Sequence, residues 1–284
     1  MKAINQAELE HYQHHGYLFP KRVLTSEEAA NCLRRLSDME TRIGAPLTQA
    51  DLKWRGASYL YSPWVNALVR DPRVLDLVED VIGPDILVFW STFFIKEPGT
   101  ASFTAWHQDA TYFGLEPYEH VTAWIALSDA GSDAGCMDVI SSKGAPRQLA
   151  HAAARLPDSI NGAGQVIVEP FDDSDPVAMA LMAGEASLHH TLCCHRSAPN
   201  RASHRRVGLG ISYIPAHVKP TGSYRMPALC VRGSNKYDHF DLLPDPAEEL
   251  DAQGIAVHEK TYARFRENYY EQERLHDELF GKPA

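Results

Sequence analysis

Apolar residues in the first 84 positions recur every three or four residues, the spacing of one face of an α-helix. In the second such segment, Thr25 and Glu28 form the sequence of a capping box, and Gly44 follows the last apolar residue. In the third, Asp-Pro opens the apolar run and Gly-Pro closes it. Helices are therefore predicted at 4–16, 25–44 and 71–83, where they would brace the outside of a sheet.

From Ile86 onward the pattern changes to short apolar runs separated by Gly, Pro, Asp and Ser. Seven such runs predict a mainly β fold with flanking helices, built on a double-stranded β-helix of the jelly-roll or cupin kind. The predicted strands span 86–95, 121–127, 136–141, 165–169, 177–182, 186–190 and 206–214. We expect one domain over 1–284, with a helical region at 1–84, a β core at about 86–232 and a C-terminal helix at about 260–280.

The composition of the chain limits which kinds of molecule it is expected to bind and where in the cell it is expected to act. The chain has 284 residues, of which 44% are hydrophobic, enough for a substantial core. Its formal net charge of −10 argues against nucleic acid or a membrane as a partner, because those surfaces select for clustered Lys and Arg. We recognise no signal peptide or membrane span, and the five cysteines form no paired framework, so we expect a cytoplasmic protein. These patterns do not indicate the oligomeric state.

Three side chains of the metal-ligand type stand out: His107, Asp109 and His195. Two imidazoles and one carboxylate can bind a divalent iron on one face and leave the opposite positions open, as in non-haem Fe(II) oxygenases. His107 and Asp109 are two apart, so both would point the same way on an extended strand. His195 joins them only if a second strand returns beside the first. A His-x-Asp triplet alone is weak evidence, because it also arises by chance in a chain with 14 His and 37 acidic residues.

The segments around these residues carry a more specific signal. The first reads Trp-His-Gln-Asp at 106–109, and the later ones read Gly-Glu at 184–185, His-Arg-Ser-Ala-Pro-Asn at 195–200 and Arg at 206. This series resembles the phytanoyl-CoA dioxygenase family of Fe(II)- and 2-oxoglutarate-dependent oxygenases. The resemblance covers most of the chain, and its later part is similar to a bacterial subgroup of small-molecule hydroxylases.

The resemblance implies that His107, Asp109 and His195 hold Fe(II). It also implies that Arg206 and Ser197 bind the distal carboxylate of the cosubstrate 2-oxoglutarate. A planar guanidinium suits that carboxylate, because it donates two parallel charge-assisted hydrogen bonds. The neighbouring Arg205 would face the other way on an extended strand. Trp124 matches an aromatic residue that lines the cosubstrate pocket, although packing in the core explains it as well.

The reaction implied by the resemblance uses O2 and 2-oxoglutarate to hydroxylate an unactivated C–H bond of a small polar metabolite, with release of succinate and CO2. Related halogenases have a small residue at the position of Asp109, so the carboxylate here favours hydroxylation. Desaturation, cyclisation and epimerisation stay open as outcomes in a natural-product pathway. A catalytically silent cupin-type metal-binding protein and a zinc hydrolase are further alternatives. Arg206 and Ser197 count against the first, and the lack of a His-Glu-x-x-His helix counts against the second.

Substrate contacts are expected from 50–64, a segment rich in aromatic and polar residues that would either form a lid or pack against the barrel. It contributes Arg55 and Tyr59. The resemblance adds Asn161, His189 and Arg232, the last as the partner of an anionic group. We expect a phosphonate or an amino-acid-derived metabolite as substrate. Many relatives have Pro-Gly-Ser-His in the loop that here reads Ile-Ser-Ser-Lys-Gly at 140–144, a change expected to affect the substrate mouth.

Overall fold

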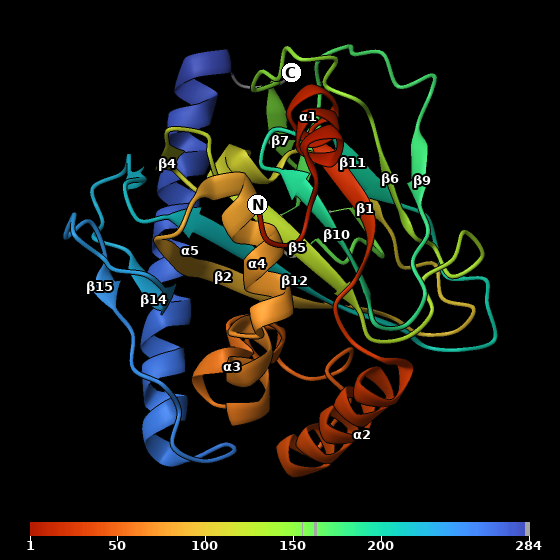
Figure 1. Ribbon diagram of the computed structural model, residues 1–284, viewed down its shortest axis with the longest axis vertical. Helices are drawn as coiled ribbons and strands as arrows, with labels where there is room; N and C mark the ends of the chain where they lie inside the picture. The colour runs from red at the N-terminus through yellow and green to blue at the C-terminus, as the bar shows by residue number, and fades with distance from the viewer. Residues whose placement is uncertain (155, 162–163, 282–284) are drawn as a thin grey trace.

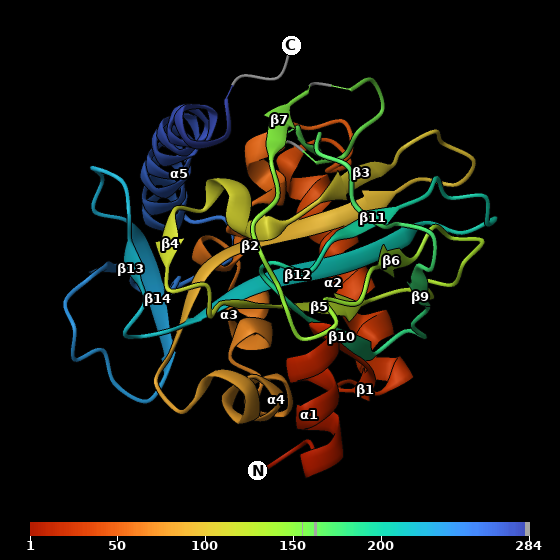
Figure 2. The same cartoon turned by 90° about the horizontal axis from the view of Figure 1, so that it is seen from above.

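Two facing β-sheets form the centre of the molecule (Figure 1 and Figure 2). The structure is a computed structural model and describes residues 1–154, 156–161 and 164–281. The larger sheet has the spatial order β1 (Tyr17–Arg22), β10 (Glu185–His190), β5 (Val121–Ala126), β12 (Arg206–Pro215), β2 (Ile86–Lys96), β14 (Pro227–Arg232) and β15 (Asp241–Leu242). The smaller sheet has the order β3 (Thr104–His107), β11 (His195–Ser197), β6 (Met137–Val139) and β9 (Val177–Met179). This arrangement confirms the predicted mainly β, jelly-roll fold class.

Shorter pairs and helices complete the fold. Two two-stranded ladders pair β13 (Lys219–Pro220) with β4 (Leu115–Glu116), and β7 (His151–Ala153) with β8 (Gln165–Ile167). The α-helices are α1 (Gln6–His15), α2 (Ser26–Ile43), α3 (Pro63–Val69), α4 (Pro72–Ile82) and α5 (Ala252–Phe280). The short 3-10 helices are η1 (Leu52–Arg55), η2 (Ser58–Leu60) and η3 (Asp109–Tyr112). None of the helices in the described part of the chain is long and apolar enough to cross a bilayer.

The main hydrophobic core lies on the outer face of the larger sheet. There β12 presents Val207, Leu209 and Ile211, which belong to the same buried cluster as the apolar side chains of α3 and α4. Tyr213, also on this face, donates a hydrogen bond from its hydroxyl to the carbonyl of Val69 at 2.9 Å. Because side chains alternate along a strand, the other face of β12 is left free to line a cavity between the two sheets.

The helix boundaries follow the capping signals. Thr25 and Glu28 form both hydrogen bonds of the predicted capping box at the start of α2, and Asp71 caps α4, which ends before Gly83. The predicted start of the C-terminal helix at about 260 was wrong. That helix begins at Ala252, because the Asp251 carboxylate accepts a hydrogen bond from the Gly254 N–H at 2.7 Å and acts as the N-cap.

The sequence pattern missed several strands. β1 contains a proline, a residue that sheets tolerate at an edge, and β1 is indeed the edge strand beside β10. β3 and β11 are too short to give an alternating pattern, although they carry metal-ligand candidates. α5, the long blue helix in Figure 1, passes one end of the sheets and contacts η2, η3 and β7.

Candidate active site

Strand pairing brings the two distant histidines together. β11 runs antiparallel to β3 in the smaller sheet, with His195 directly opposite His107. Their ring centroids are 4.1 Å apart. One ligand atom from each of His107, Asp109 and His195 can be chosen so that all three atoms lie within 4.8 Å of one another. The three residues therefore form a possible iron site.

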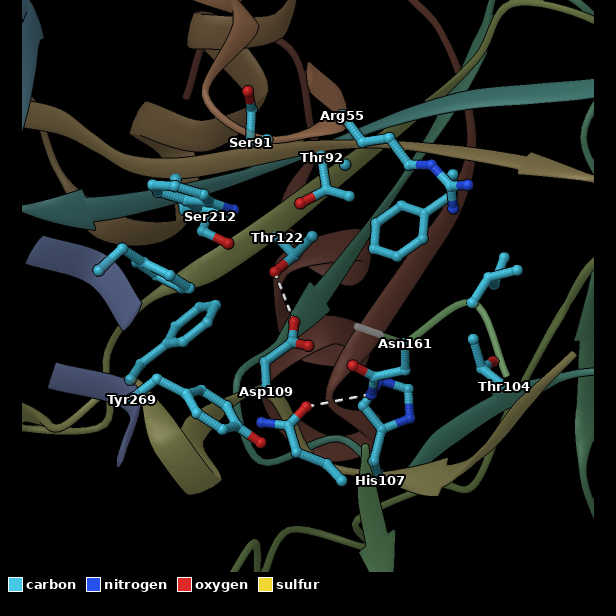
Figure 3. Close-up of a pocket in the computed structure, with 18 of the residues that line it drawn as sticks. Arg55, Ser91, Thr92, Thr104, His107, Asp109, Thr122, Asn161, Ser212 and Tyr269 are labelled. Atoms are coloured by element: carbon cyan, nitrogen blue, oxygen red, sulfur yellow. Dashed lines mark hydrogen bonds between the residues drawn. The ribbon is translucent and has the colours of Figure 1, made fainter. Parts of the chain in front are cut away.

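Asp109 reaches this cluster by a different route from the one predicted. β3 ends at His107, and Asp109 begins the 3-10 helix η3, so the two residues do not share an extended strand. The Asp109 carboxylate is held instead by Thr122 on β5, whose hydroxyl donates to Oδ2 at 2.7 Å (Figure 3). His189 Nε2 lies 3.2 Å from the same oxygen. The carboxylate is thus oriented by the larger sheet.

The protonation of the two histidines suits metal binding. His107 Nδ1 lies 2.8 Å from the carbonyl of Ala105, and His195 Nδ1 lies 2.9 Å from the carbonyl of Cys193. Because a carbonyl can only accept, Nδ1 carries the proton in each ring and a neutral ring keeps its lone pair on Nε2. Burial lowers the pKa of both imidazoles, which keeps them neutral.

Electrostatics keep the Asp109 carboxylate charged. Burial raises its pKa, but the surrounding histidines, His195 foremost, outweigh burial and hold the pKa well below its usual range. Two neutral imidazoles and one ionised carboxylate on one side of a cavity are the donor set of a non-haem iron(II) centre. The residues present therefore fit that metal.

Gln108, between two of the ligand candidates, is almost fully buried and holds their loop in place. Its side-chain amide donates to the carbonyls of Arg147 and Leu192 at 2.8 and 2.7 Å, and its oxygen accepts from the Leu149 N–H at 2.8 Å. Its backbone N–H donates to His151 Nε2 at 3.0 Å. The loop is therefore tied to two other segments of the chain.

A buried cationic group lies in the same cavity. The Arg206 side chain is only 3% exposed and donates to the carbonyl of Gly135 at 2.8 Å, while its Nε has no hydrogen-bond partner among the described residues. The guanidinium carbon lies 5.4 Å from the centre of the Trp124 ring. Burial lowers the pKa of Arg206 to about 10, so the group stays charged at neutral pH. A buried charge with an unpartnered N–H fits a carboxylate ligand.

Lys96, which was not among the predicted site residues, lies opposite Arg206 on the neighbouring strand and contacts Ser197. Its side chain is fully buried, and its Nζ donates to the Ser197 hydroxyl at 2.7 Å and to the Ala198 carbonyl. Burial and the charge of Arg206 lower its pKa to about 6. Lys96 is the last residue of β2 and directly follows the predicted strand at 86–95, where a lysine at the end of an apolar run indicates no role by itself.

Comparison with known proteins decides the family. The family model for phytanoyl-CoA dioxygenase (PhyH) matches residues 12–208. This chain belongs to the phytanoyl-CoA dioxygenase family. A phytanoyl-CoA dioxygenase domain-containing protein 1 of Danio rerio is 28% identical over 167 residues, which are 57% of this chain and 56% of the relative. The chain thus matches little more than half the length of that relative.

Two further proteins match over more of the chain. The 1-deoxypentalenic acid 11-beta-hydroxylase of Streptomyces arenae is 26% identical over 240 residues, 75% of this chain and 81% of the relative. The structure of the non-heme monooxygenase ThoJ superposes with a TM-score of 0.82 at 27% identity, covering 94% of this chain and 99% of ThoJ.

More distant structures share the fold. CytC3 with Fe(II) and alpha-ketoglutarate has a TM-score of 0.65 at 20% identity and covers 88% of this chain and 96% of CytC3. The alpha-ketoglutarate-dependent epimerase SnoN has a TM-score of 0.60 at 21% identity and covers 87% of this chain and 93% of SnoN. The family, together with the ligand cluster and the buried arginine, makes iron(II) and 2-oxoglutarate the cofactor and cosubstrate that this site fits.

A cavity of about 780 Å³ joins the predicted site residues of this dioxygenase family member. Its lining includes the metal-ligand triad, all three predicted cosubstrate residues (Arg206, Ser197 and Trp124), and three of the five predicted substrate residues: Arg55, Asn161 and His189. Figure 3 shows Arg55 across the cavity from His107 and Asn161. Arg205 points away and pairs with Glu40 and Glu97.

Two predicted substrate residues need correction. Tyr59 is fully buried in the main core and does not line the cavity, because η2 packs that half of the 50–64 segment beneath α3. Arg232 is ion-paired with Asp76 and Glu79 at 2.6 and 2.8 Å, also outside the cavity. The 50–64 segment is therefore divided between the two predictions. Asp51, Leu52, Arg55 and Gly56 line the cavity, whereas residues 57–62 are buried by packing, which was the alternative prediction.

Proposed function

We propose that this protein is an Fe(II)- and 2-oxoglutarate-dependent dioxygenase that hydroxylates an unactivated C–H bond of a small molecule. Each turnover would convert one 2-oxoglutarate and one O2 into succinate and CO2 and place one oxygen atom on the substrate. The observation that carries the proposal is the cavity shared by the His107–Asp109–His195 cluster and a buried arginine with an unpartnered N–H.

Each site residue then has a role. His107, Asp109 and His195 would hold the iron, with the imidazoles presenting Nε2. Arg206 would pair with the distal carboxylate of 2-oxoglutarate, and Ser197, already oriented by Lys96, would donate its hydroxyl to the same carboxylate. Trp124 would form the wall beside it. When bound, iron with 2-oxoglutarate and O2 supplies an oxidant able to remove hydrogen from an unactivated carbon.

The carboxylate of Asp109 supports hydroxylation over halogenation, since it takes the position that a halide would need on the metal. The bacterial hydroxylase that matches over most of this chain supports the same outcome. A silent metal-binding protein would gain nothing from a buried Arg206, whose desolvation costs free energy unless an anion compensates it. Desaturation, cyclisation and epimerisation use the same cosubstrate, so the mass of the product distinguishes them.

The experiment uses the full-length protein with Fe(II), ascorbate and 2-oxoglutarate. We expect iron-dependent succinate release, slow without substrate and faster when a substrate is added, and 2-oxoglutarate binding by calorimetry under anaerobic conditions. The matched control is the same protein loaded with Zn(II), which should bind 2-oxoglutarate without releasing succinate. Failure to bind 2-oxoglutarate in the presence of Fe(II), together with absence of succinate, would reject the proposal.

A further inference from the structure

The inner face of β12 divides the cavity into two halves. Its inward residues are Arg206, Gly208, Gly210 and Ser212, in steps of two along the strand. Arg206 marks one end, with Ser197 and Trp124, and we call this end the carboxylate half. Ser212 marks the other end, where it lies opposite Trp90 on β2 and Thr122 on β5. We call this end the far half; its lining also includes Phe113 from the η3 segment and Tyr262, Phe265 and Tyr269 from α5.

The two glycines make room for large rings along the floor. A Cβ atom at Gly208 would lie 1.9 Å from the Trp124 ring, and one at Gly210 would lie 2.8 Å from the Phe94 ring. Outside the strand, a Cβ at Gly56 would lie 2.6 Å from the Trp90 ring. Three aromatic rings therefore pack directly against the backbone of glycines. Because no side chain lies beneath them, these large rings line the cavity without filling it.

The wall of the far half is a fixed aromatic cluster. Trp90 stacks on Phe265 with ring centroids 3.8 Å apart and an interplanar angle of 15°. Phe113 lies 5.9 Å from Phe265 in a T-shaped arrangement, and Tyr269 is held edge-on by Tyr112 at 4.8 Å. Such contacts between rings fix their orientation and present a preformed apolar surface. Figure 3 shows Tyr269 and Ser212 on the side of Asp109 away from His107.

Outside the metal site and the carboxylate half, the charged side chains in the described lining are Asp51, Arg55, Arg266 and Glu273. Arg55 donates to the backbone carbonyls of Leu47 and Thr48 at 2.8 and 3.0 Å. Arg266, at the exposed rim, donates to the Tyr270 hydroxyl at 2.7 Å. Glu273 also lines the cavity, and its charge disfavours an anion at the α5 side. Figure 3 shows Arg55 on the opposite side of the cavity from Tyr269 and Ser212, and Arg266 is exposed, so the described part of the far half offers no buried cation to a phosphonate.

Besides Glu273, the far half presents neutral hydroxyl groups to a ligand. Ser212 and Thr92 have inward hydroxyls that Figure 3 places above Asp109. Ser212 is 7% exposed. Hydroxyls of this kind bind oxygen substituents such as hydroxyl, ether or carbonyl groups without requiring charge.

We infer that the far half binds a substrate with a bulky, ring-containing apolar body and neutral oxygen substituents, and that it selects against phosphonates and free amino acids. This inference rests on the proposed function and names its substrate class. Pockets of roughly 300–1,000 Å³ hold drug-sized ligands, so a cavity of about 780 Å³ has room for both the cosubstrate and a fused-ring molecule. Arg232, the predicted partner of an anionic substrate group, is ion-paired outside the cavity.

The test measures binding by calorimetry under anaerobic conditions, with the full-length protein loaded with Fe(II) and 2-oxoglutarate. The apolar probes are progesterone and naringenin, and the ionic probes are 2-aminoethylphosphonate and L-arginine. We expect at least one apolar probe to bind at least tenfold more tightly than either ionic probe. Absence of binding by both apolar probes, or tighter binding of an ionic probe, overturns the inference.

Variants place the bound probe in the far half. Phe265→Ala should weaken binding of the apolar probe at least tenfold, and Phe265→Leu, which keeps most of the volume, should weaken it less. The control is Phe280→Ala, near the end of the same helix, where the side chain is 38% exposed. Equal weakening by Phe280→Ala, or no weakening by either Phe265 variant, overturns the inference.

Binding of 2-oxoglutarate distinguishes a failure of the proposed function from a failure of the inferred substrate class. It should be unchanged in the Phe265 variants, because the cosubstrate occupies the carboxylate half. If the unaltered protein fails to bind 2-oxoglutarate, the proposed function fails. If it binds 2-oxoglutarate but neither apolar probe, only the substrate class fails.

Discussion

The carboxylate half and the far half of the cavity are built from different kinds of element. In the carboxylate half, Arg206, Ser197 and Trp124 all belong to strands, and the two histidines of the metal-ligand triad beside them are placed by the pairing of β3 with β11. In the far half, much of the wall comes from α5, a helix that packs against the end of the sheets. The register of a sheet fixes the positions of its side chains, whereas single residues on the surface of an added helix can be substituted independently. This division suits an enzyme in which the strands hold the metal and the cosubstrate and the helix determines which substrate binds.

The two halves also differ in electrostatics. The carboxylate half buries the charged guanidinium of Arg206 and the amine of Lys96, and the adjoining metal site holds the Asp109 carboxylate, whose side chain is 17% exposed. Buried charge is costly unless a ligand or counter-ion compensates it, so this end requires specific partners. The far half buries aromatic rings and hydroxyls, which impose a shape rather than a charge. Substitutions in one half should therefore leave binding in the other nearly unchanged.

The largest effect is expected at the metal site. Asp109→Ala removes the only carboxylate of the triad, and two imidazoles alone should hold iron poorly. We expect succinate release to fall more than about 100-fold, beyond the 10–100-fold typical of residues that merely support ligands. Iron content and succinate formation measure this. Unchanged turnover in Asp109→Ala would remove this residue from the ligand set and with it the contrast between the halves.

The contrast between the strand-built carboxylate half and the helix-built far half also explains which features of the fold and the site could be predicted from the sequence. The capping signals of α2 and α4 and the strand runs depend on local order, and the structure has them close to the expected positions. The proximity of His107 and His195 could be predicted from the motif series, although the strand argument for Asp109 was wrong. That residue lies in η3, where Thr122 from another strand orients it.

The far half could not be predicted, because its formation depends on tertiary packing. The aromatic residues of α5 have the same helical spacing as core residues, and nothing local shows that Phe265 meets Trp90. Tyr59 and Arg232 illustrate the converse. Both are residue types common in binding sites, yet the fold places one in the core and pairs the other with acidic side chains.

The next largest effect is expected at Arg206. Arg206→Met removes the charge proposed to bind the distal carboxylate, and truncating one partner of a buried charge pair costs at least about 2 kcal/mol. That corresponds to roughly a 30-fold higher Kd for 2-oxoglutarate. Calorimetry with the Fe(II)-loaded protein measures it, and binding of the apolar probes should change little.

Arg205→Met is the matched control for Arg206→Met. Arg205 immediately precedes Arg206, just before β12 begins, but it pairs with Glu40 and Glu97 outside the cavity. Its loss should lower the free energy of unfolding by about 1 kcal/mol and leave the Kd for 2-oxoglutarate unchanged. Equal weakening of 2-oxoglutarate binding by both variants would mean that the pocket does not distinguish the two arginines.

A smaller effect is expected at Gln108, which supports the metal ligands without facing the metal. Gln108→Ala leaves the carbonyls of Arg147 and Leu192 and the Leu149 N–H without their side-chain partner. We expect roughly tenfold weaker iron binding, measured by competition with a chelator, together with a loss of about 1–3 kcal/mol of stability. The exposed Gln253→Ala is the control and should change neither. Iron affinity equal to that of the unaltered protein would show that the β3–β11 pairing alone positions the ligands.

The smallest effect is expected at Ser212, the polar group of the far half. Ser212→Ala removes one neutral hydrogen bond, worth about 0.5–1.5 kcal/mol, and should raise the Kd of an oxygen-bearing apolar probe by roughly two- to tenfold. The exposed Ser174→Ala serves as control. Ser212 and Arg206 lie on the same face of one strand, separated by Gly208 and Gly210. The Kd for 2-oxoglutarate in Ser212→Ala therefore tests more directly than the Kd for the probe whether the two halves are independent. If Ser212→Ala weakens binding of 2-oxoglutarate as much as binding of the probe, the glycines do not separate two sites and the cavity is a single binding site.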